Sequence, residues 1–270
     1  MRDRPGPADV KGTVSRPPVL KSLGQHFLHQ RSVIDAIVRQ FDPRPGDVVV
    51  EIGPGRGALT EVIAPRVAAL HVVELDRMLA DRLQAAAAAM SNLVVHHQDA
   101  LRFDYCSVAT RIRVIGNLPY NISTPLLFRL LDHLRCIEDM HLMLQKEVAD
   151  RMLAAPGSRI YGRLSVMVQQ RCRGELVLKV APGAFTPPPK VQSAVVALEP
   201  EREPSCPVAD PKRFAALVKR AFAHRRKTLR NALKGMIDED ELVRCGISPG
   251  WRAEQVSVAQ FAQLSNTTAA

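Results

Sequence analysis

The chain has 270 residues, of which 46% are hydrophobic, and this is enough for one large domain and a small second one. No hydrophobic run approaches the roughly 20 residues that a membrane-spanning helix needs, so we expect no membrane contact. The net charge of +10 predicts a polyanionic partner, with general solubility as the alternative.

The first 18 residues carry basic side chains and four prolines but no hydrophobic stretch, which argues against a secretory signal. We expect residues 1–20 to be a disordered tail. A transit peptide is the weaker alternative, because Asp3 and Asp9 are unusual in one.

The cysteines are far apart, and no two of them form a Cys-x-x-Cys pair. They are Cys106, Cys136, Cys172, Cys206 and Cys245. We therefore expect neither a metal site nor a disulfide framework, but reduced thiols in a cytoplasmic protein.

Strand and helix patterns alternate over the first half of the chain. Strands are expected at 47–52, 69–75, 93–96, 112–116 and 140–144, and helices at 32–41, 59–64, 77–90 and 124–134. The first strand is a β-branched run that ends in glycines, as is typical of a buried parallel strand. The alternation predicts an α/β fold with a parallel sheet and right-handed crossovers.

The pattern changes after Gln145. Helices are expected at 147–153 and 164–171, and strands near 176–180 and 193–198, separated by a proline-rich turn at 186–190. These strands should form an antiparallel pair at one edge of the sheet. Residues 200–207 hold three prolines and predict a linker, and only helical patterns follow. We therefore divide the chain into the tail, a domain over 21–203 and a helical domain over 204–270.

A glycine-rich loop follows the first strand. It runs from Glu51 to Gly57 and includes Gly53 and Gly55. Glycines let a backbone turn sharply and approach a ligand closely. Dinucleotide folds space their glycines as GxGxxG, whereas this loop reads GxGxG after an acidic residue. The loop therefore resembles the S-adenosylmethionine loop of methyltransferases, with an NAD-dependent dehydrogenase as the alternative.

Two acidic residues follow the next two strands. Glu74 is placed to accept both ribose hydroxyls, and Asp99 to accept from an adenine amino group. Each of them alone could be an ordinary surface acid. Ligands bind at the carboxyl ends of such strands, so three suitable features at three successive strand ends indicate a nucleoside site.

The fourth strand ends in Asn117-Leu118-Pro119-Tyr120, a variant of the NPPY-type signature of amino-methyltransferases. An adenine amino nitrogen is a poor nucleophile because its lone pair is delocalised into the ring. The Asn117 side-chain oxygen and the Leu118 carbonyl can accept its two N–H bonds and point the lone pair at a methyl donor. Tyr120 offers a face on which a flipped base can stack. The alternative is a helix-capping asparagine and a core tyrosine.

Nine Lys or Arg residues and no acidic residue lie between Pro211 and Gly235. We expect a helix in which Arg226, Arg230 and Lys234 share one face. The residues expected to contact RNA phosphates are Arg225, Arg226, Lys227, Arg230 and Lys234. A solvated helix face is the alternative, although such faces normally mix charges of both signs.

Over residues 20–265 the chain resembles the rRNA adenine N6,N6-dimethyltransferase family, and within it the bacterial small-subunit enzymes. The stretches that carry the resemblance are GQHFL (24–28), EIGPGRGALT (51–60), VELD (73–76), QDA (98–100), GNLPYNISTP (116–125), LQKE (144–147), YGRLS (161–165), FTPPPKV (185–191) and RRKTLRN (225–231). The erythromycin-resistance methyltransferases share the fold, but the first and last stretches fit the small-subunit enzymes better.

The resemblance implies a Rossmann-like seven-stranded sheet and S-adenosylmethionine as cofactor, with no metal. It implies dimethylation of two adjacent adenosines in the 3′-terminal hairpin of small-subunit rRNA in the assembling subunit, by a cytoplasmic monomer. The cofactor residues would be His26, Leu28, Gly53, Gly55, Glu74, Asp99 and Asn117, and Phe185 would form a second stacking face. His26 and Gln192 stand where Asn and Asp are usual. A non-catalytic assembly factor is the competing hypothesis, and the intact Asn117, Tyr120 and glycine loop disfavour it.

Overall fold

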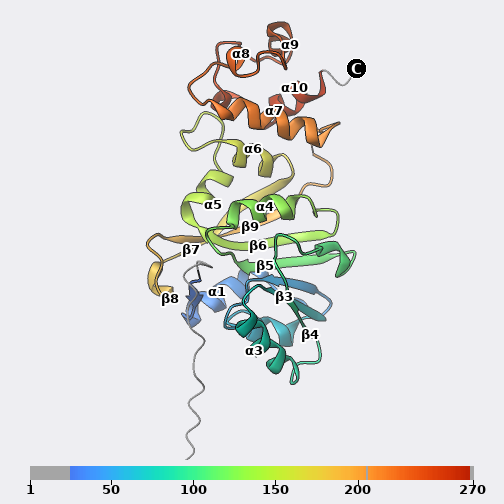
Figure 1. Ribbon diagram of the computed structural model, residues 1–270, viewed down its shortest axis with the longest axis vertical. Coiled ribbons are helices and arrows are strands. Elements are labelled where there is room, and N and C mark those ends of the chain that lie inside the picture. Colours follow the sequence, from blue (N-terminus) through green and yellow to red (C-terminus); the bar gives the residue numbers. More distant parts are fainter. Residues whose placement is uncertain (1–24, 205, 268–270) are drawn as a thin grey trace, which may run out of the picture.

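The computed structural model describes residues 25–204 and 206–267, so the tail expected over 1–20 lies outside the described residues. Figure 1 shows a sheet with its helices at one end of the molecule and a group of helices, α7 to α10, at the other. No helix among the described residues is long and apolar enough to cross a membrane.

A seven-stranded sheet forms the centre of the larger part. Its strands are β2 (Val48–Ile52), β3 (Ala69–Glu74), β4 (Leu93–His97), β5 (Ile112–Asn117), β6 (Ile137–Gln145), β7 (Cys172–Val180) and β9 (Ser193–Pro200). Their order is β4-β3-β2-β5-β6-β9-β7, and the first five run parallel. β9 is antiparallel to both β6 and β7. The predicted seven-stranded α/β sheet with an antiparallel pair at one edge is confirmed.

Helices cover both faces of this sheet (Figure 1). One face packs against α1 (Arg31–Phe41), α2 (Thr60–Ile63) and α3 (Arg77–Ala87), and the other against α4 (Ser123–Leu131), α5 (Lys146–Met152) and α6 (Arg163–Gln169). Short 3-10 helices lie at Ala64–Arg66, Tyr105–Ser107 and Pro182–Ala184. Successive strand residues point to opposite faces, so Val49 and Val50 enter different core clusters and β2 is buried on both sides.

A second, two-stranded sheet was not predicted. β1 (Phe27–Leu28) pairs antiparallel with β8 (Phe185–Thr186), with Leu28 opposite Phe185. Strands of two residues carry no readable periodicity, so they could not be predicted from the amino-acid pattern. This pairing brings the segment 25–28 against the proline-rich turn that follows β8.

The C-terminal helices form the predicted second group. They are α7 (Pro211–Ala223), α8 (Leu229–Ala232), α9 (Glu239–Arg244) and α10 (Val258–Asn266), with a 3-10 helix at Ala253–Gln255. Asp210 caps α7 by accepting from the amides of Lys212 and Arg213. The hydrophobic cluster of the C-terminal helices also includes Tyr161 and Val166, so these helices pack directly on the region of α6.

The prediction of one continuous basic helix is wrong. α7 ends at Ala223, and α8 begins only at Leu229. The Leu229 amide donates 2.7 Å to the Trp251 carbonyl, and the Arg230 amide 3.2 Å to the Pro249 carbonyl, so both bonds leave the helix. Leu229 is fully buried, and its packing explains the break. Arg226, Arg230 and Lys234 therefore do not share a helix face.

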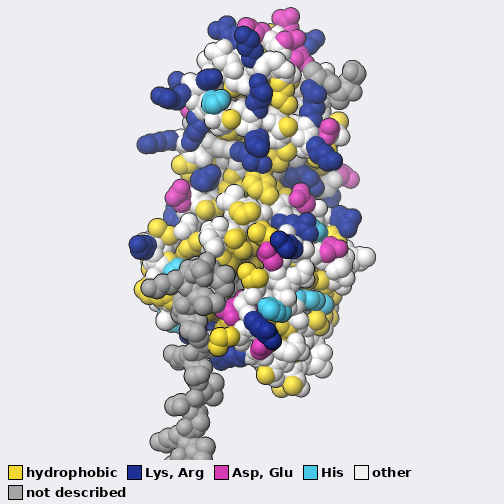
Figure 2. Space-filling view, in the orientation of Figure 1, with side chains coloured by type: hydrophobic (Ala, Val, Ile, Leu, Met, Phe, Trp, Pro, Cys, Tyr) yellow, Lys and Arg dark blue, Asp and Glu magenta, His cyan; other side chains and the backbone are white. Residues whose placement is uncertain are grey.

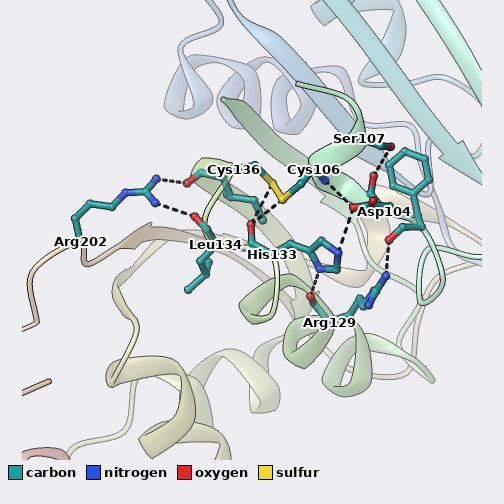
Figure 3. Close-up of a disulfide and its surroundings, with 10 residues drawn as sticks. Asp104, Cys106, Ser107, Arg129, His133, Leu134, Cys136 and Arg202 are labelled. Atoms are coloured by element: carbon teal, nitrogen blue, oxygen red, sulfur yellow. Dashed lines mark hydrogen bonds and ion pairs between the residues drawn. A yellow bond between two sulfur atoms is a disulfide. The ribbon is translucent and has the colours of Figure 1, made fainter. Parts of the chain in front are cut away.

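The expectation of reduced thiols is corrected for two of the five cysteines. Cys106 and Cys136 form a disulfide with their Cα atoms 5.4 Å apart, and the other three are free. Figure 3 shows the pair where the connection after β4 meets the turn before β6, with Arg202 of the linker bound to the same turn. The 30-residue separation hid this contact, because only the fold of β5 and α4 brings the two ends together.

Candidate active site

A cavity of about 210 Å³ opens at the carboxyl ends of the parallel strands. Its walls are the loops after β2, β3, β4 and β5 and the segment 25–28. Every predicted cofactor residue lines it, namely His26, Leu28, Gly53, Gly55, Glu74, Asp99 and Asn117. Leu118 and Tyr120 line it as well. The structure therefore brings the glycine loop, the two acidic residues and the NLPY loop around one space, as strand order in α/β sheets requires.

The glycine loop needs its glycines at two positions. Gly53 and Gly55 have φ angles of 64° and 57°, in the left-handed region that other residues avoid. A Cβ atom on Gly53 would lie 3.3 Å from the Asn117 carbonyl oxygen, and one on Gly55 would lie 3.1 Å from the Phe27 ring. Side chains here would close the space between the loop and its neighbours, so both glycines keep the cavity open.

Glu74 ends β3 and is held by backbone donors. Its Oε2 accepts from the Gly55 amide at 3.1 Å and its Oε1 from the Asp76 amide at 2.9 Å. Burial raises the pKa of this carboxyl, and the two amide bonds oppose the shift. The carboxyl is thus fixed in orientation at the cavity wall and retains lone pairs for hydroxyl donors.

Asp99 lies after β4 and is half-buried. Its Oδ1 accepts from the Leu101 amide at 2.9 Å, which fixes the loop that carries Ala100 and Leu101 into the cavity wall. Asp99 follows β4 and Glu74 ends the neighbouring parallel strand β3, so both carboxyls lie at the same edge of the sheet and line the cavity.

Glu51, the acidic residue before the glycines, is a further residue of the cavity wall to which no role was predicted. It lines the cavity but is only 1% exposed, and its Oε2 accepts from the Thr60 hydroxyl at 2.6 Å. Burial raises the pKa of Glu51 to about 7, and the charge of Glu74 adds to the shift. The acidic position before the glycines was the available signal, but its burial follows only from the packing of the strand.

The NLPY loop is fixed at both ends. The Asn117 amide nitrogen Nδ2 donates 2.9 Å to the His26 carbonyl, which leaves Oδ1 as the acceptor of that side chain. The Leu118 amide donates 2.9 Å to the Met143 carbonyl on β6. The Tyr120 hydroxyl lies 2.6 Å from the Ser193 hydroxyl, and burial raises the pKa of this tyrosine. The loop can therefore present two oxygens and an aromatic ring in a defined arrangement.

Phe185 is not brought to this cavity. Its ring is 2% exposed and packs in the cluster beneath the sheet with Leu28 and Ala184. The structure therefore places Phe185 in the hydrophobic core, and the expected second stacking face is not formed by its ring. Gln192 stands where the family pattern has Asp. Its side chain is exposed, and its main-chain carbonyl accepts from the Lys146 amide at 2.9 Å. A main-chain contact of this kind does not depend on the side chain.

The five predicted phosphate-binding residues are all exposed. Arg225, however, donates 2.7 Å to the Arg159 carbonyl and also pairs with Glu254, so it joins the two parts of the molecule. Arg230 lies 3.7 Å from Glu239. Figure 2 shows many Lys and Arg side chains over the helical end and its junction with the sheet domain. No group of three metal-ligating side chains occurs within residues 25–204 and 206–267.

A family model described as ribosomal RNA adenine dimethylase matches residues 19–270. The chain belongs to this family. A ribosomal RNA small subunit methyltransferase A of Xanthomonas campestris pv. campestris (strain B100) is 53% identical over 251 residues, 92% of this chain and 96% of the relative. The corresponding protein of Xanthomonas euvesicatoria pv. vesicatoria (strain 85-10) is 51% identical over the same shares.

Two solved structures resemble the chain over most of its length. A dimethyladenosine transferase from Plasmodium falciparum has a TM-score of 0.79 and 26% identity, covering 88% of this chain and 96% of that one. The 23S rRNA methyltransferase ErmE has a TM-score of 0.70 and 27% identity, covering 88% and 98%. The predicted family and the prediction of an rRNA adenine methyltransferase are confirmed, and the dehydrogenase alternative is not supported.

Proposed function

We propose that the chain transfers methyl groups from S-adenosylmethionine to the N6 amino groups of two adjacent adenosines in the 3′-terminal hairpin of small-subunit rRNA. The observation that carries the proposal is the meeting of the glycine loop, Glu74 and Asn117 around one cavity. The two Xanthomonas relatives, named as small-subunit methyltransferases, favour the small subunit over the large one.

The residues present fit the cofactor. The glycine loop leaves room for its amino-acid part, and Glu74 would accept from the ribose hydroxyls because its carboxyl is already held toward the cavity by two amides. Asp99 would accept from the adenine amino group. When bound, S-adenosylmethionine supplies an electrophilic methyl group on a positively charged sulfur.

The NLPY loop would prepare the adenosine amine. Asn117 Oδ1 and the Leu118 carbonyl would each accept one N–H bond, which pulls the nitrogen out of conjugation and aims its lone pair. The ring of Tyr120 would hold the flipped base by stacking. Most of the rate gain would come from this positioning, since the amine must approach the methyl carbon in line.

The partner would be rRNA in the assembling small subunit, bound through exposed basic residues around Arg226 and Lys227. Such binding agrees with the net charge of +10. We further propose that the enzyme acts as a monomer, as the family resemblance implies. Assembly of the subunit would take place in the cytoplasm, and we place the enzyme there.

Calorimetry and a methylation assay on the same variants test the proposal. Glu74→Ala should weaken S-adenosylmethionine binding by on the order of 1–3 kcal/mol, since two buried hydroxyls lose an acceptor. Asn117→Ala should depress methyl transfer to unmethylated small subunits far more than cofactor affinity. An Asn117→Ala variant with near-normal turnover, or a parent protein that binds NAD and not S-adenosylmethionine, would refute the proposal.

A further inference from the structure

The segment 25–28 joins the NLPY loop to β8 and the turn that follows it. Phe27 and Leu28 pair with Thr186 and Phe185, and the His26 carbonyl holds the Asn117 amide at 2.9 Å. The position of this segment therefore helps to orient the amide of Asn117, whose Oδ1 is the proposed acceptor of the adenosine amine.

The His26 side chain fixes the segment on its other side. Its Nδ1 lies 2.8 Å from the Pro187 carbonyl, in the turn directly after β8. A carbonyl only accepts, so Nδ1 must carry the proton in this bond. The imidazole ring packs against the ring of Tyr120, with the centroids 5.3 Å apart and the planes 31° from each other.

We propose that His26 is a positioning residue of the reaction loop. The His26 carbonyl orients Asn117, and the His26 ring supports Tyr120. The Nδ1 bond to the Pro187 carbonyl fixes His26, and with it these two contacts, relative to the turn after β8. The inference rests on the proposed function and assigns the side chain to the adenosine side of the site, although the family resemblance implies a cofactor contact.

Three substitutions separate the parts of this role. In His26→Asn the side-chain Nδ2 takes the place of Nδ1, because both atoms are bonded to Cγ, so the donor to Pro187 is kept and the ring is lost. His26→Phe keeps a ring against Tyr120 and removes the donor. His26→Ala removes both. The measurements are kcat and KM with small subunits as substrate, and S-adenosylmethionine affinity by calorimetry.

The proposal predicts that His26→Ala and His26→Phe lower kcat about tenfold or more, since a bond that fixes the loop is lost. His26→Asn should keep more of the parent's kcat than His26→Phe or His26→Ala, because the bond to Pro187 is kept and only the ring contact with Tyr120 is lost. Cofactor affinity should change by less than about threefold in all three variants, and their thermal melts provide the control for folding.

Two results would overturn the proposal. One is a loss of cofactor affinity that matches the loss of kcat, which would place the side chain at the cofactor. The other is a His26→Ala variant with the kcat of the parent. A parent protein that methylates no small subunit would instead refute the proposed function, so the two failures are distinguishable.

Discussion

Glu51 is a buried acid that accepts a hydrogen bond from the Thr60 hydroxyl. Because its pKa is raised to about 7, its carboxyl changes its protonation state near neutral pH. In the unfolded chain a glutamate releases its proton near pH 4.5. Between these two values the folded protein holds a proton that the unfolded chain has lost. Raising the pH through this window therefore favours unfolding.

We predict that Glu51 costs the protein about 3 kcal/mol of unfolding free energy as pH rises from 4.5 to 7. The Glu51→Gln variant lacks this group and should lose less stability over the same window. Urea denaturation of both proteins at pH 5 and pH 7.5, without cofactor, measures the difference. Equal pH dependence in the two proteins would show that Glu51 is ionised in the folded state.

At the scale of elements, the disulfide joins the loop that carries Asp99 to the turn before β6. It closes a loop of 30 residues. Loop-closure entropy for this length corresponds to stabilisation of about 3–4 kcal/mol relative to the reduced protein. The native structure around it does not depend on the bond alone, since Arg202 donates to the Leu134 carbonyl at 2.8 Å in the same turn (Figure 3).

We therefore predict that Cys136→Ser lowers the free energy of unfolding by about 3 kcal/mol under oxidising conditions and much less in dithiothreitol. Cys245→Ser, which removes a free thiol, is the matched control and should change little in either buffer. If the parent protein shows the same stability with and without reductant, the disulfide does not form in solution.

The turn between α7 and α8 carries the exposed residues Arg226 and Lys227, and the exposed Lys234 follows α8. Arg226, Lys227 and Lys234 have no ion-pair partner within the described part of the chain, whereas Arg225 is bound to Arg159 and Glu254. Unpaired charges release the most counterion when they meet phosphates. We therefore expect the phosphates to contact this turn and Lys234, and not a continuous helix face.

Replacing Arg226, Lys227 and Lys234 with Gln should weaken RNA binding and flatten the plot of log affinity against log salt by up to about 3 in slope. Arg77→Gln, an exposed change on the sheet domain, is the control and should leave the slope unchanged. Arg225→Gln differs from these variants: it should also lower the free energy of unfolding, because Arg225 joins the two parts of the molecule. If a folded triple variant has the same salt dependence of RNA affinity as the parent, these residues are solvated surface charges and do not contact phosphates.

The parallel strands and their helices were predictable because their periodicity is strong, and their ends agree with the structure within three residues in the first half of the chain. The meeting of the glycine loop, Glu74, Asp99 and the NLPY loop around one cavity was predictable because strand ends converge in any such sheet, whereas His26 and Leu28 were indicated only by the family resemblance. β1 and β8, the disulfide and the break after Ala223 were not, since each depends on contacts between distant residues. The burial of Phe185 and the pKa of Glu51 likewise arise from packing, which a linear pattern does not contain.

At the scale of the whole molecule, the basic end is fixed to the sheet domain. The Gly157 amide donates 2.7 Å to the Glu254 carbonyl, and the Tyr161 hydroxyl 3.1 Å to the Val256 carbonyl. Tyr161 and Val166 also share a hydrophobic cluster with the C-terminal helices. The distance between the proposed phosphate contacts and the cavity is thus set by the fold, so a docked RNA should present only certain adenosines to the cavity.

Mapping of the methylated nucleotides tests this account most directly. Small subunits that lack the modification are incubated with the protein and S-adenosylmethionine, and the rRNA is digested and analysed by mass spectrometry. The account predicts N6,N6-dimethyladenosine at two adjacent positions of the 3′-terminal hairpin, and none with Asn117→Ala. Methylation of large-subunit rRNA, of an atom other than N6, or of no RNA at all would contradict it.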